Sequence, residues 1–381
     1  MRSFVSMSVL SAGLLIPMLS LHCSELTPAQ MDAAVNHYYD SWKKKYLVPS
    51  ARVPGDYKIK FDKQGSTVSE AMGYGMLITV TMAGVDPMAR GYFDGLDRFR
   101  KRFPSSINQA FMCWKIPPDE HPAKSDSATD GDLDMALALL MAYRQWGDPS
   151  YFREATDLIR NLASSLVRPD FSLRLGDWND APGQTRTSDF MPTHFRAFQV
   201  ATGDPLWGKV ESRCYDILED LQEKSAPLTG LVPDFAVEKN GSWRPAKPMF
   251  LESAHDGEFY YNACRVPWRI GWAAQATGDV RARRILDRFM QWATIHIDSP
   301  EDFRAGYHLN GTGLHGGDYD TACFISPTGV AALATGHRPW MQAAFAYGIQ
   351  RKEGYYEESV NLLSLLVMSG KAWLPLGIGK H

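Results

Sequence analysis

Two kinds of helical stretch alternate along this 381-residue chain, and the alternation constrains its fold more than any other feature. Some stretches, such as MALALLMA at residues 135–142, are small and apolar nearly all round. Others, such as YFREATDLIR at residues 151–160, are amphipathic and charged. A helix that is apolar all round is buried, whereas an amphipathic helix lies outside it. The alternation therefore predicts an all-α fold, a closed barrel of helical hairpins.

Apolar residues recur at the 3.6-residue spacing of a helix in about twelve stretches. Several stretches end at a glycine, which caps a helix cheaply. A helical solenoid is the alternative, but no short repeat with a shared motif is visible. The stretches are residues 28–47, 69–84, 89–103, 132–147, 151–167, 194–203, 207–225, 260–277, 280–297, 320–335, 338–351 and 355–369.

Four long segments between these helices are rich in Pro, Gly, Asp and Trp: residues 104–131, 168–193, 226–259 and 298–319. Long structured loops in a compact domain usually carry function, so four of them on one barrel are expected to build a cleft. No linker rich in Pro, Ser and Gly divides the chain. We therefore expect residues 25–381 to form a single domain.

The N-terminus has the layout of a secretory signal peptide. Arg2 is followed by an apolar run that ends near Leu19, and polar sequence begins near Ser24. The run is short for a membrane span, which needs about 20 apolar residues. We expect residues 1–24 to be removed, the mature protein to be secreted or periplasmic, and no membrane association afterwards.

Charge and cysteine usage argue against several classes of partner. The formal net charge is −3 and no basic stripe stands out, which disfavours nucleic acid. The five cysteines include no C-x-x-C pair, so neither a zinc nor a redox site is indicated, although disulfides remain possible in an exported protein. We expect a monomer that uses no metal and no cofactor.

Glu70 lies in the segment SEAMGYGM, residues 69–76, at the start of an apolar stretch with almost no other charge. Hydrolysis of a glycosidic bond without a metal needs two carboxyl groups, one of which must stay protonated. A partly apolar pocket favours the protonated form, so Glu70 is a candidate proton donor. The alternative is a glutamate that the helix dipole favours at a helix N-terminus.

A more specific pattern is ATDGDLDMALALLMAYRQW at residues 128–146. Asp130, Asp132 and Asp134 crowd the start of an apolar helix. Calcium loops also alternate aspartates, but they require a glycine at the sixth position and a glutamate at the twelfth, and this segment has neither. Asp130 and Asp134 are one turn apart and share a face. Helix capping explains one of the three, but three together suggest that at least one has a sugar-binding role.

These two segments, together with YNACRVPWRI at residues 261–270, resemble the landmarks of glycoside hydrolase family 8 in order and spacing from about residue 30 to 370. The resemblance implies an (α/α)6 barrel and hydrolysis of cellulose, lichenan, xylan or chitosan with inversion of configuration. It also implies that Glu70 is the general acid and that Asp130 holds and distorts the sugar at the cleavage point.

The chain departs from many members of this family at one position. It has Asn262 where they carry an aspartate as general base, and an amide cannot accept a proton at neutral pH. Either catalysis is lost, or another carboxylate is the base, as in the family's subgroup with Asn here and a base on a nearby loop. The candidates are Glu252, Asp256 and Glu258. We favour Glu252, because residues 249–251 form an apolar anchor that would aim its loop inward; Asn262 would then orient the water or bind a hydroxyl.

The remaining candidates are substrate-binding residues. Arg265 follows Asn262 by one turn and is expected either to hold the charge of Asp130 or of the base, or to form a structural ion pair. Trp114, Trp178 and Tyr319 lie in the long loops and are either sugar platforms or hydrophobic plugs.

Three functions remain open on these grounds. The first is an endo-acting hydrolase of β-1,4-glucan or mixed-linkage β-glucan. The second is a chitosanase or xylanase of the same family, and a cationic chitosan would need extra carboxylates in the cleft. The third, from another class, is a glycan-binding protein that has lost its general base.

Overall fold

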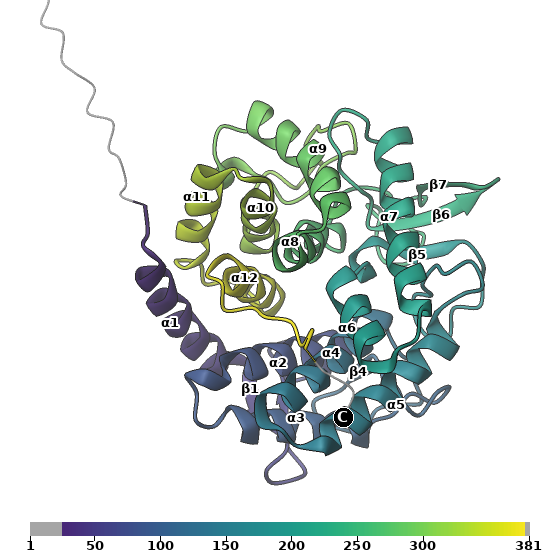
Figure 1. Cartoon of the computed structure of the whole chain (residues 1–381), viewed down its shortest axis with the longest axis vertical. Coiled ribbons are helices and arrows are strands. Elements are labelled where there is room, and N and C mark those ends of the chain that lie inside the picture. Colours follow the sequence, from purple (N-terminus) through teal and green to yellow (C-terminus); the bar gives the residue numbers. More distant parts are fainter. Residues whose placement is uncertain (1–24, 378–381) are drawn as a thin grey trace, which may run out of the picture.

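The computed structural model describes residues 25–377, so the expected signal peptide lies outside the described residues. The described chain forms twelve α-helices arranged as two concentric rings (Figure 1). The inner ring consists of α2 (Ser69–Thr81), α4 (Thr129–Trp146), α6 (Pro192–Thr202), α8 (Val266–Thr277), α10 (Ala322–Thr335) and α12 (Tyr355–Met368). The outer ring consists of α1 (Pro28–Tyr46), α3 (Ala89–Arg102), α5 (Pro149–Leu166), α7 (Leu206–Lys224), α9 (Val280–His296) and α11 (Arg338–Gly348).

The inner helices pack in sequence order, and α12 packs against α2, which closes the ring. Each outer helix packs against an inner one, for example α3 on α2 and α5 on α4. The prediction of a closed barrel is confirmed, and the fold is an (α/α)6 barrel. The two kinds of stretch lie in their expected rings. All the residues of inner helix α4 from Thr129 to Ala142 are buried, whereas outer helix α5 buries only one face.

Helices α2 and α4 approach unusually closely because glycines face the contact. A Cβ built on Gly131 would lie 2.5 Å from the carbonyl carbon of Ser69, and one on Gly73 would lie 2.8 Å from Cβ of Asp134. No side chain fits at either position without moving a backbone. The two glycines therefore bring the N-termini of α2 and α4, with Glu70 and Asp130, to one end of the barrel.

Two helices begin three or more residues from the predicted position. Helix α8 begins at Val266 rather than near residue 260, with Pro267 in its first turn, where a missing N–H costs nothing. Asn262 precedes a short 3₁₀ helix, η3 (Ala263–Arg265), and so lies in a loop. Helix α4 begins at Thr129, so all three aspartates of the 128–146 motif lie inside it. Three further 3₁₀ helices are η1 (Met82–Gly84), η2 (Thr187–Asp189) and η4 (Pro300–Asp302).

The long loops contain short antiparallel strands that periodicity did not predict. They are β1 (Leu47–Pro49) with β2 (Tyr57–Ile59), β3 (Thr67–Val68) with β4 (Lys115–Ile116), and the three-stranded order β5 (Gln184–Arg186), β6 (Phe235–Lys239), β7 (Ser242–Pro245). Pairs β3–β4 and β5–β6 lie directly before Glu70 and at Arg186, so these strands tie the loops to the pocket described below. Among the described helices, none is long and apolar enough to cross a membrane.

Candidate active site

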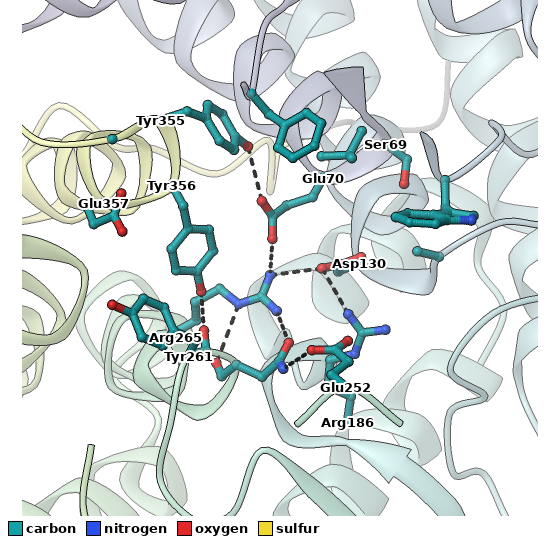
Figure 2. A pocket seen from close by; sticks show the side chains of 16 residues that line it. Ser69, Glu70, Asp130, Arg186, Glu252, Tyr261, Arg265, Tyr355, Tyr356 and Glu357 are labelled. Atoms are coloured by element: carbon teal, nitrogen blue, oxygen red, sulfur yellow. Dashed lines mark hydrogen bonds and ion pairs between the residues drawn. The ribbon is translucent and has the colours of Figure 1, made fainter. Parts of the chain in front are cut away.

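A cavity of about 470 Å³ opens at the end of the barrel where α2, α4 and α12 begin (Figure 2). It collects Glu70, Asp130, Glu252, Asn262 and Arg265, which are separated by up to 195 residues in the chain. The other lining residues are Phe61, Val68, Ser69, Trp114, Ala128, Arg186, Tyr261, Gly354, Tyr355, Tyr356 and Glu357. Six of the eight site residues predicted from the sequence thus line one cavity.

Glu70 is the second residue of α2 and lies largely buried beside the cavity. Its Oε1 accepts a hydrogen bond from the hydroxyl of Tyr355 at 3.1 Å, and its Oε2 accepts one from Nη1 of Arg265 at 3.0 Å. Burial raises the pKa of Glu70 to about 7, because desolvation outweighs the opposing charge of Arg265 while Asp130 adds to the increase. Glu70 therefore keeps its proton in weakly acidic solution.

Asp130 is also buried but remains ionised. Its Oδ2 accepts a hydrogen bond from Arg265 Nη1 at 2.8 Å and lies 3.6 Å from Nη1 of Arg186. Burial alone would raise its pKa, but the charges of Arg186 and Arg265 overcome this and lower it to about 2. The cavity thus holds one carboxyl group that is protonated below neutral pH and another that is charged.

Glu252 reaches the cavity from the loop before η3 and contacts Asn262. Nδ2 of Asn262 donates to Oε2 of Glu252 at 2.8 Å, and Oδ1 of Asn262 accepts from Nη2 of Arg265 at 2.8 Å. Arg265 in turn contacts Glu70 and Asp130, so a continuous set of polar contacts joins the three carboxylates (Figure 2).

The other two candidate bases point away from the cavity. Glu258 pairs with Nδ1 of His308 at 3.0 Å and lines a separate cavity of about 370 Å³. Asp256 is fully buried and accepts hydrogen bonds from backbone amides of its own loop. Of the three candidates, only Glu252 lines the cavity that contains Glu70.

The expected apolar anchor of the Glu252 loop is wrong in two of its three residues. Met249 is 72% exposed and Leu251 is 43% exposed. Only Phe250 packs inward, with its ring 5.7 Å from that of Phe235. The loop is held instead by polar contacts to buried Asp256, which the pattern of apolar residues did not reveal.

The three aspartates of the 128–146 motif occupy separate environments. Asp130 lines the cavity, whereas Asp134 lies beneath it and pairs with both terminal nitrogens of Arg269 at 2.7 Å and with Nε2 of His194 at 2.7 Å. Asp132 faces the other way and accepts from the amide of Met112 at 3.1 Å. Within residues 25–377, no cluster of His, Cys, Asp or Glu is suited to hold a metal ion.

The loop aromatics divide into two groups. Trp114 is exposed and lines the cavity. Tyr319 is exposed at its edge, where its hydroxyl lies 2.8 Å from that of Tyr261, a lining residue. Trp178 is partly exposed beside Gly176 and does not line the cavity.

Sequence reasoning missed Arg186 and Tyr355. Arg186 ends β5 in a loop without a recognised motif, and only its place beside Asp130 reveals its role in the charge balance. Tyr355 begins α12 directly after Gly354, much as Glu70 begins α2, and a search for polar residues at the starts of inner helices would have found it.

Comparisons with known proteins agree with this geometry. Residues 16–370 match the family model described as Glycosyl hydrolases family 8. A β-glucanase of Niallia circulans is 40% identical over 93% of this chain and 88% of its own. An endoglucanase of Bacillus sp. (strain KSM-330) is 37% identical over 93% of this chain and 79% of its own. The solved structure of a β-1,3-1,4-glucanase from Paenibacillus sp. X4 superposes with a TM-score of 0.89 at 40% identity, over 92% of this chain and 95% of that one.

Proposed function

The chain belongs to glycosyl hydrolase family 8, and from this membership we propose that it is an endo-acting, inverting hydrolase of β-1,4-linked or mixed-linkage β-glucan. The named relatives at 37–40% identity are a β-glucanase, an endoglucanase and a β-1,3-1,4-glucanase, which supports glucan as the substrate. The observation that carries the mechanism is the line of contacts from Glu70 through Arg265 and Asn262 to Glu252.

Glu70 is the general acid in this proposal. Its raised pKa keeps it protonated in weakly acidic solution, so it donates its proton to the glycosidic oxygen as the bond from that oxygen to C1 breaks. Positive charge then develops on the sugar ring. Asp130 remains ionised beside it, and a fixed carboxylate stabilises such charge in a site sheltered from water.

Glu252 is the general base. It takes one proton from a water molecule while the water oxygen bonds to C1 on the face opposite the leaving group, which inverts the configuration. Asn262 cannot accept that proton, but its amide donates to Glu252 and accepts from Arg265, which fixes the orientation of the carboxylate. A carboxylate in this place argues against the alternative of a glycan-binding protein without a base.

Chitosan is less favoured as a substrate than glucan. A cationic ring would require unpaired negative charge in the cleft. Two arginines line the cavity, and Arg265 pairs with both Glu70 and Asp130. Arg186 and Arg265 thus offset part of the negative charge that a polycation would need in this cavity.

We also propose that residues 25–381 form one catalytic domain and that the mature enzyme is an exported monomer. One contiguous core contains residues of all twelve helices, which supports a single domain. The signal-like residues 1–24 support export, which would bring the enzyme to polymers outside the cytoplasm.

Release of reducing sugar tests the substrate and bond cleavage. We expect turnover on carboxymethyl cellulose and lichenan, with a rapid fall in viscosity, and little on xylan or chitosan. Proton NMR of the first products should show the α-anomer. Retention of the β-anomer would contradict the mechanism, and binding without release of reducing sugar from any of the four polymers would favour the glycan-binding alternative.

A further inference from the structure

Two buried carboxylates behind the cavity have no place in the mechanism above. They are Asp234 and Asp256, and both are essentially inaccessible to solvent. Among the described residues, neither forms an ion pair with a Lys, Arg or His within 4.0 Å. Burial raises the pKa of Asp234 to about 7, against the opposing effect of its hydrogen-bond donors. Buried carboxyl groups without a cation must be stabilised by hydrogen bonds, so the donors around them show what these two groups hold in place.

The donors to Asp256 come from the loop that carries Glu252. Its Oδ2 accepts from the backbone amides of Leu251 at 2.6 Å and Glu252 at 3.0 Å. Its Oδ1 accepts from the amide of Ser253 at 2.8 Å and from the Ser253 hydroxyl at 3.2 Å. One carboxylate thus binds three consecutive amides, of which the middle one belongs to Glu252.

The donors to Asp234 come from the segment that carries Asn262. Its Oδ1 accepts from the amides of Tyr260 at 3.0 Å and Ala263 at 2.7 Å. Its Oδ2 accepts from the amide of Asn262 at 3.0 Å and from Nδ2 of that residue at 3.3 Å. This carboxylate therefore fixes both the backbone and the side chain of Asn262.

The two carboxylates are also joined to each other through the backbone. The amide of Asp234 donates to the carbonyl oxygen of Glu258 at 2.8 Å, and that of Phe235 donates to the carbonyl oxygen of Asp256 at 2.8 Å. The start of β6 thereby connects the two segments. Backbone hydrogen bonds thus fix Asp234 and Asp256 relative to each other. Asp256 binds the segment with Glu252, Asp234 binds the segment with Asn262, and the Glu252–Asn262 contact joins these two segments.

We propose that Asp256 is a positioning residue that holds Glu252 against Asn262, with Asp234 as its counterpart under Asn262. The inference rests on the proposed role of Glu252 as general base and extends it. The loop has little apolar support, because Met249 and Leu251 are exposed, so hydrogen bonds to a charged acceptor are its main constraint. Without them Glu252 moves away from the water it must deprotonate.

The first test is Asp256→Asn, measured as kcat and KM on lichenan. An asparagine keeps one acceptor oxygen but turns an NH₂ group toward backbone N–H groups, so at least one pair of contacts is lost. A displacement of about 1 Å of a reacting group lowers turnover roughly 100-fold, and we expect that fall in kcat with an unchanged KM. A kcat within about threefold of wild type in folded Asp256→Asn would overturn the proposal.

A double variant separates positioning from general damage to the fold. If Asp256 acts only through Glu252, then Glu252→Gln with Asp256→Asn has the same residual kcat as Glu252→Gln alone. Two independent losses that multiply would contradict the proposal. Wild type that cleaves no β-glucan would contradict the proposed function instead, so the two failures are distinguishable.

Asp86→Asn is the matched control. Asp86 is buried, accepts from the amide of Met88 at 2.9 Å and from the hydroxyl of Tyr39, pairs with Nζ of Lys43 at 2.6 Å, and does not line the cavity. It should leave kcat at the wild-type value. Should Asp256→Asn fail to fold, Asp256→Glu keeps the charge but pushes the loop outward by one methylene. We expect at least a tenfold loss of kcat there, and wild-type kcat would overturn the proposal equally.

Discussion

Glu70 and Asp130 accept hydrogen bonds from the same atom, Nη1 of Arg265, at 3.0 and 2.8 Å. Their pKa values nevertheless diverge, to about 7 for Glu70 and about 2 for Asp130. The difference arises because Arg186 lies beside Asp130, whereas Glu70 receives its second hydrogen bond from the neutral hydroxyl of Tyr355. Two carboxyl groups that share one donor are thus prepared for different tasks.

Arg186→Gln should shift the pH dependence of catalysis in a defined direction. In wild type, kcat/KM is expected to fall above about pH 7 as Glu70 loses its proton. The positive charge of Arg186 lowers the pKa of Glu70, so removal of Arg186 moves the fall in kcat/KM to higher pH. Loss of one of two cations at Asp130 should also reduce kcat/KM roughly 10- to 100-fold.

Measurement of kcat/KM from pH 4 to pH 9 checks both effects. Arg196→Gln is the control, because Arg196 pairs with Glu211 and Asp279 between α6, α7 and α9 and lies outside the cavity. In Arg196→Gln, kcat/KM should fall at the same pH as in wild type. If the fall in kcat/KM moves to lower pH in Arg186→Gln, then Arg186 does not act on Glu70 through charge.

Glu70→Gln should lose activity and change the pH dependence of stability. Removal of a general acid lowers kcat by about 10²–10⁴-fold. Native Glu70 titrates near 7 and the unfolded side chain near 4.5, so between these values only the native state holds the proton. This contribution to the free energy of unfolding is complete below the lower pKa and is lost as pH rises through the higher one. It amounts to about 3 kcal/mol.

Urea unfolding at pH 4.5 and pH 8.5 tests the second part. The free energy of unfolding of wild type minus that of Glu70→Gln should decrease by about 3 kcal/mol between the two pH values. Exposed Glu223 on α7 supplies the control, and Glu223→Gln should keep the free energy of unfolding within about 0.5 kcal/mol of wild type at both pH values. A constant difference for Glu70→Gln would mean that the carboxyl group is not protonated in the native state.

Much of the fold was predictable because helical periodicity is local. A buried helix such as α4 and an amphipathic helix such as α5 differ within one or two turns, so their order along the chain already implies two rings. The short strands escaped because each has two to five residues and depends on a partner far away, as Thr67 does on Ile116.

The site residues that lie in a sequence motif were predictable, whereas those that join the site only through contacts between distant parts of the chain were not. Glu70 and Asp130 each lie in the first turn of an inner helix, which placed them at a common end of the barrel. The contact between Tyr355 and Glu70 spans 285 residues and leaves no local pattern. Asp256 and Glu252 belong to one acidic loop in the sequence, and only the amides around Asp256 reveal that it supports the loop.

Asp134→Asn should destabilise the barrel strongly. Asp134, Arg269 and His194 are fully buried, and the carboxylate holds both nitrogens of the guanidinium. Removal of one partner from a buried ion pair leaves an uncompensated charge, which costs about 3–5 kcal/mol. Thermal and urea unfolding at pH 7 measure this loss. Asp157→Asn breaks the exposed pair with Arg160 and should cost less than about 1 kcal/mol; an equal loss in both variants would contradict the buried network.

Gly131→Ala tests whether the close approach of α2 and α4 sets the site. In an unconstrained helix the change would stabilise by about 1 kcal/mol, as expected for Gly91→Ala, where the added Cβ meets only the end of the Met88 side chain at 3.9 Å. At position 131 the Cβ would lie 2.5 Å from the carbonyl carbon of Ser69 and 2.7 Å from its oxygen, and the backbone there cannot yield without moving Glu70. We expect a net loss of about 1–3 kcal/mol in the free energy of unfolding and at least a tenfold fall in kcat. Gly91→Ala should gain stability and keep its kcat, so the pair of variants separates the effect of the α2–α4 contact from that of helix propensity. Wild-type kcat in Gly131→Ala would show that catalysis tolerates a displacement of Glu70 relative to Asp130.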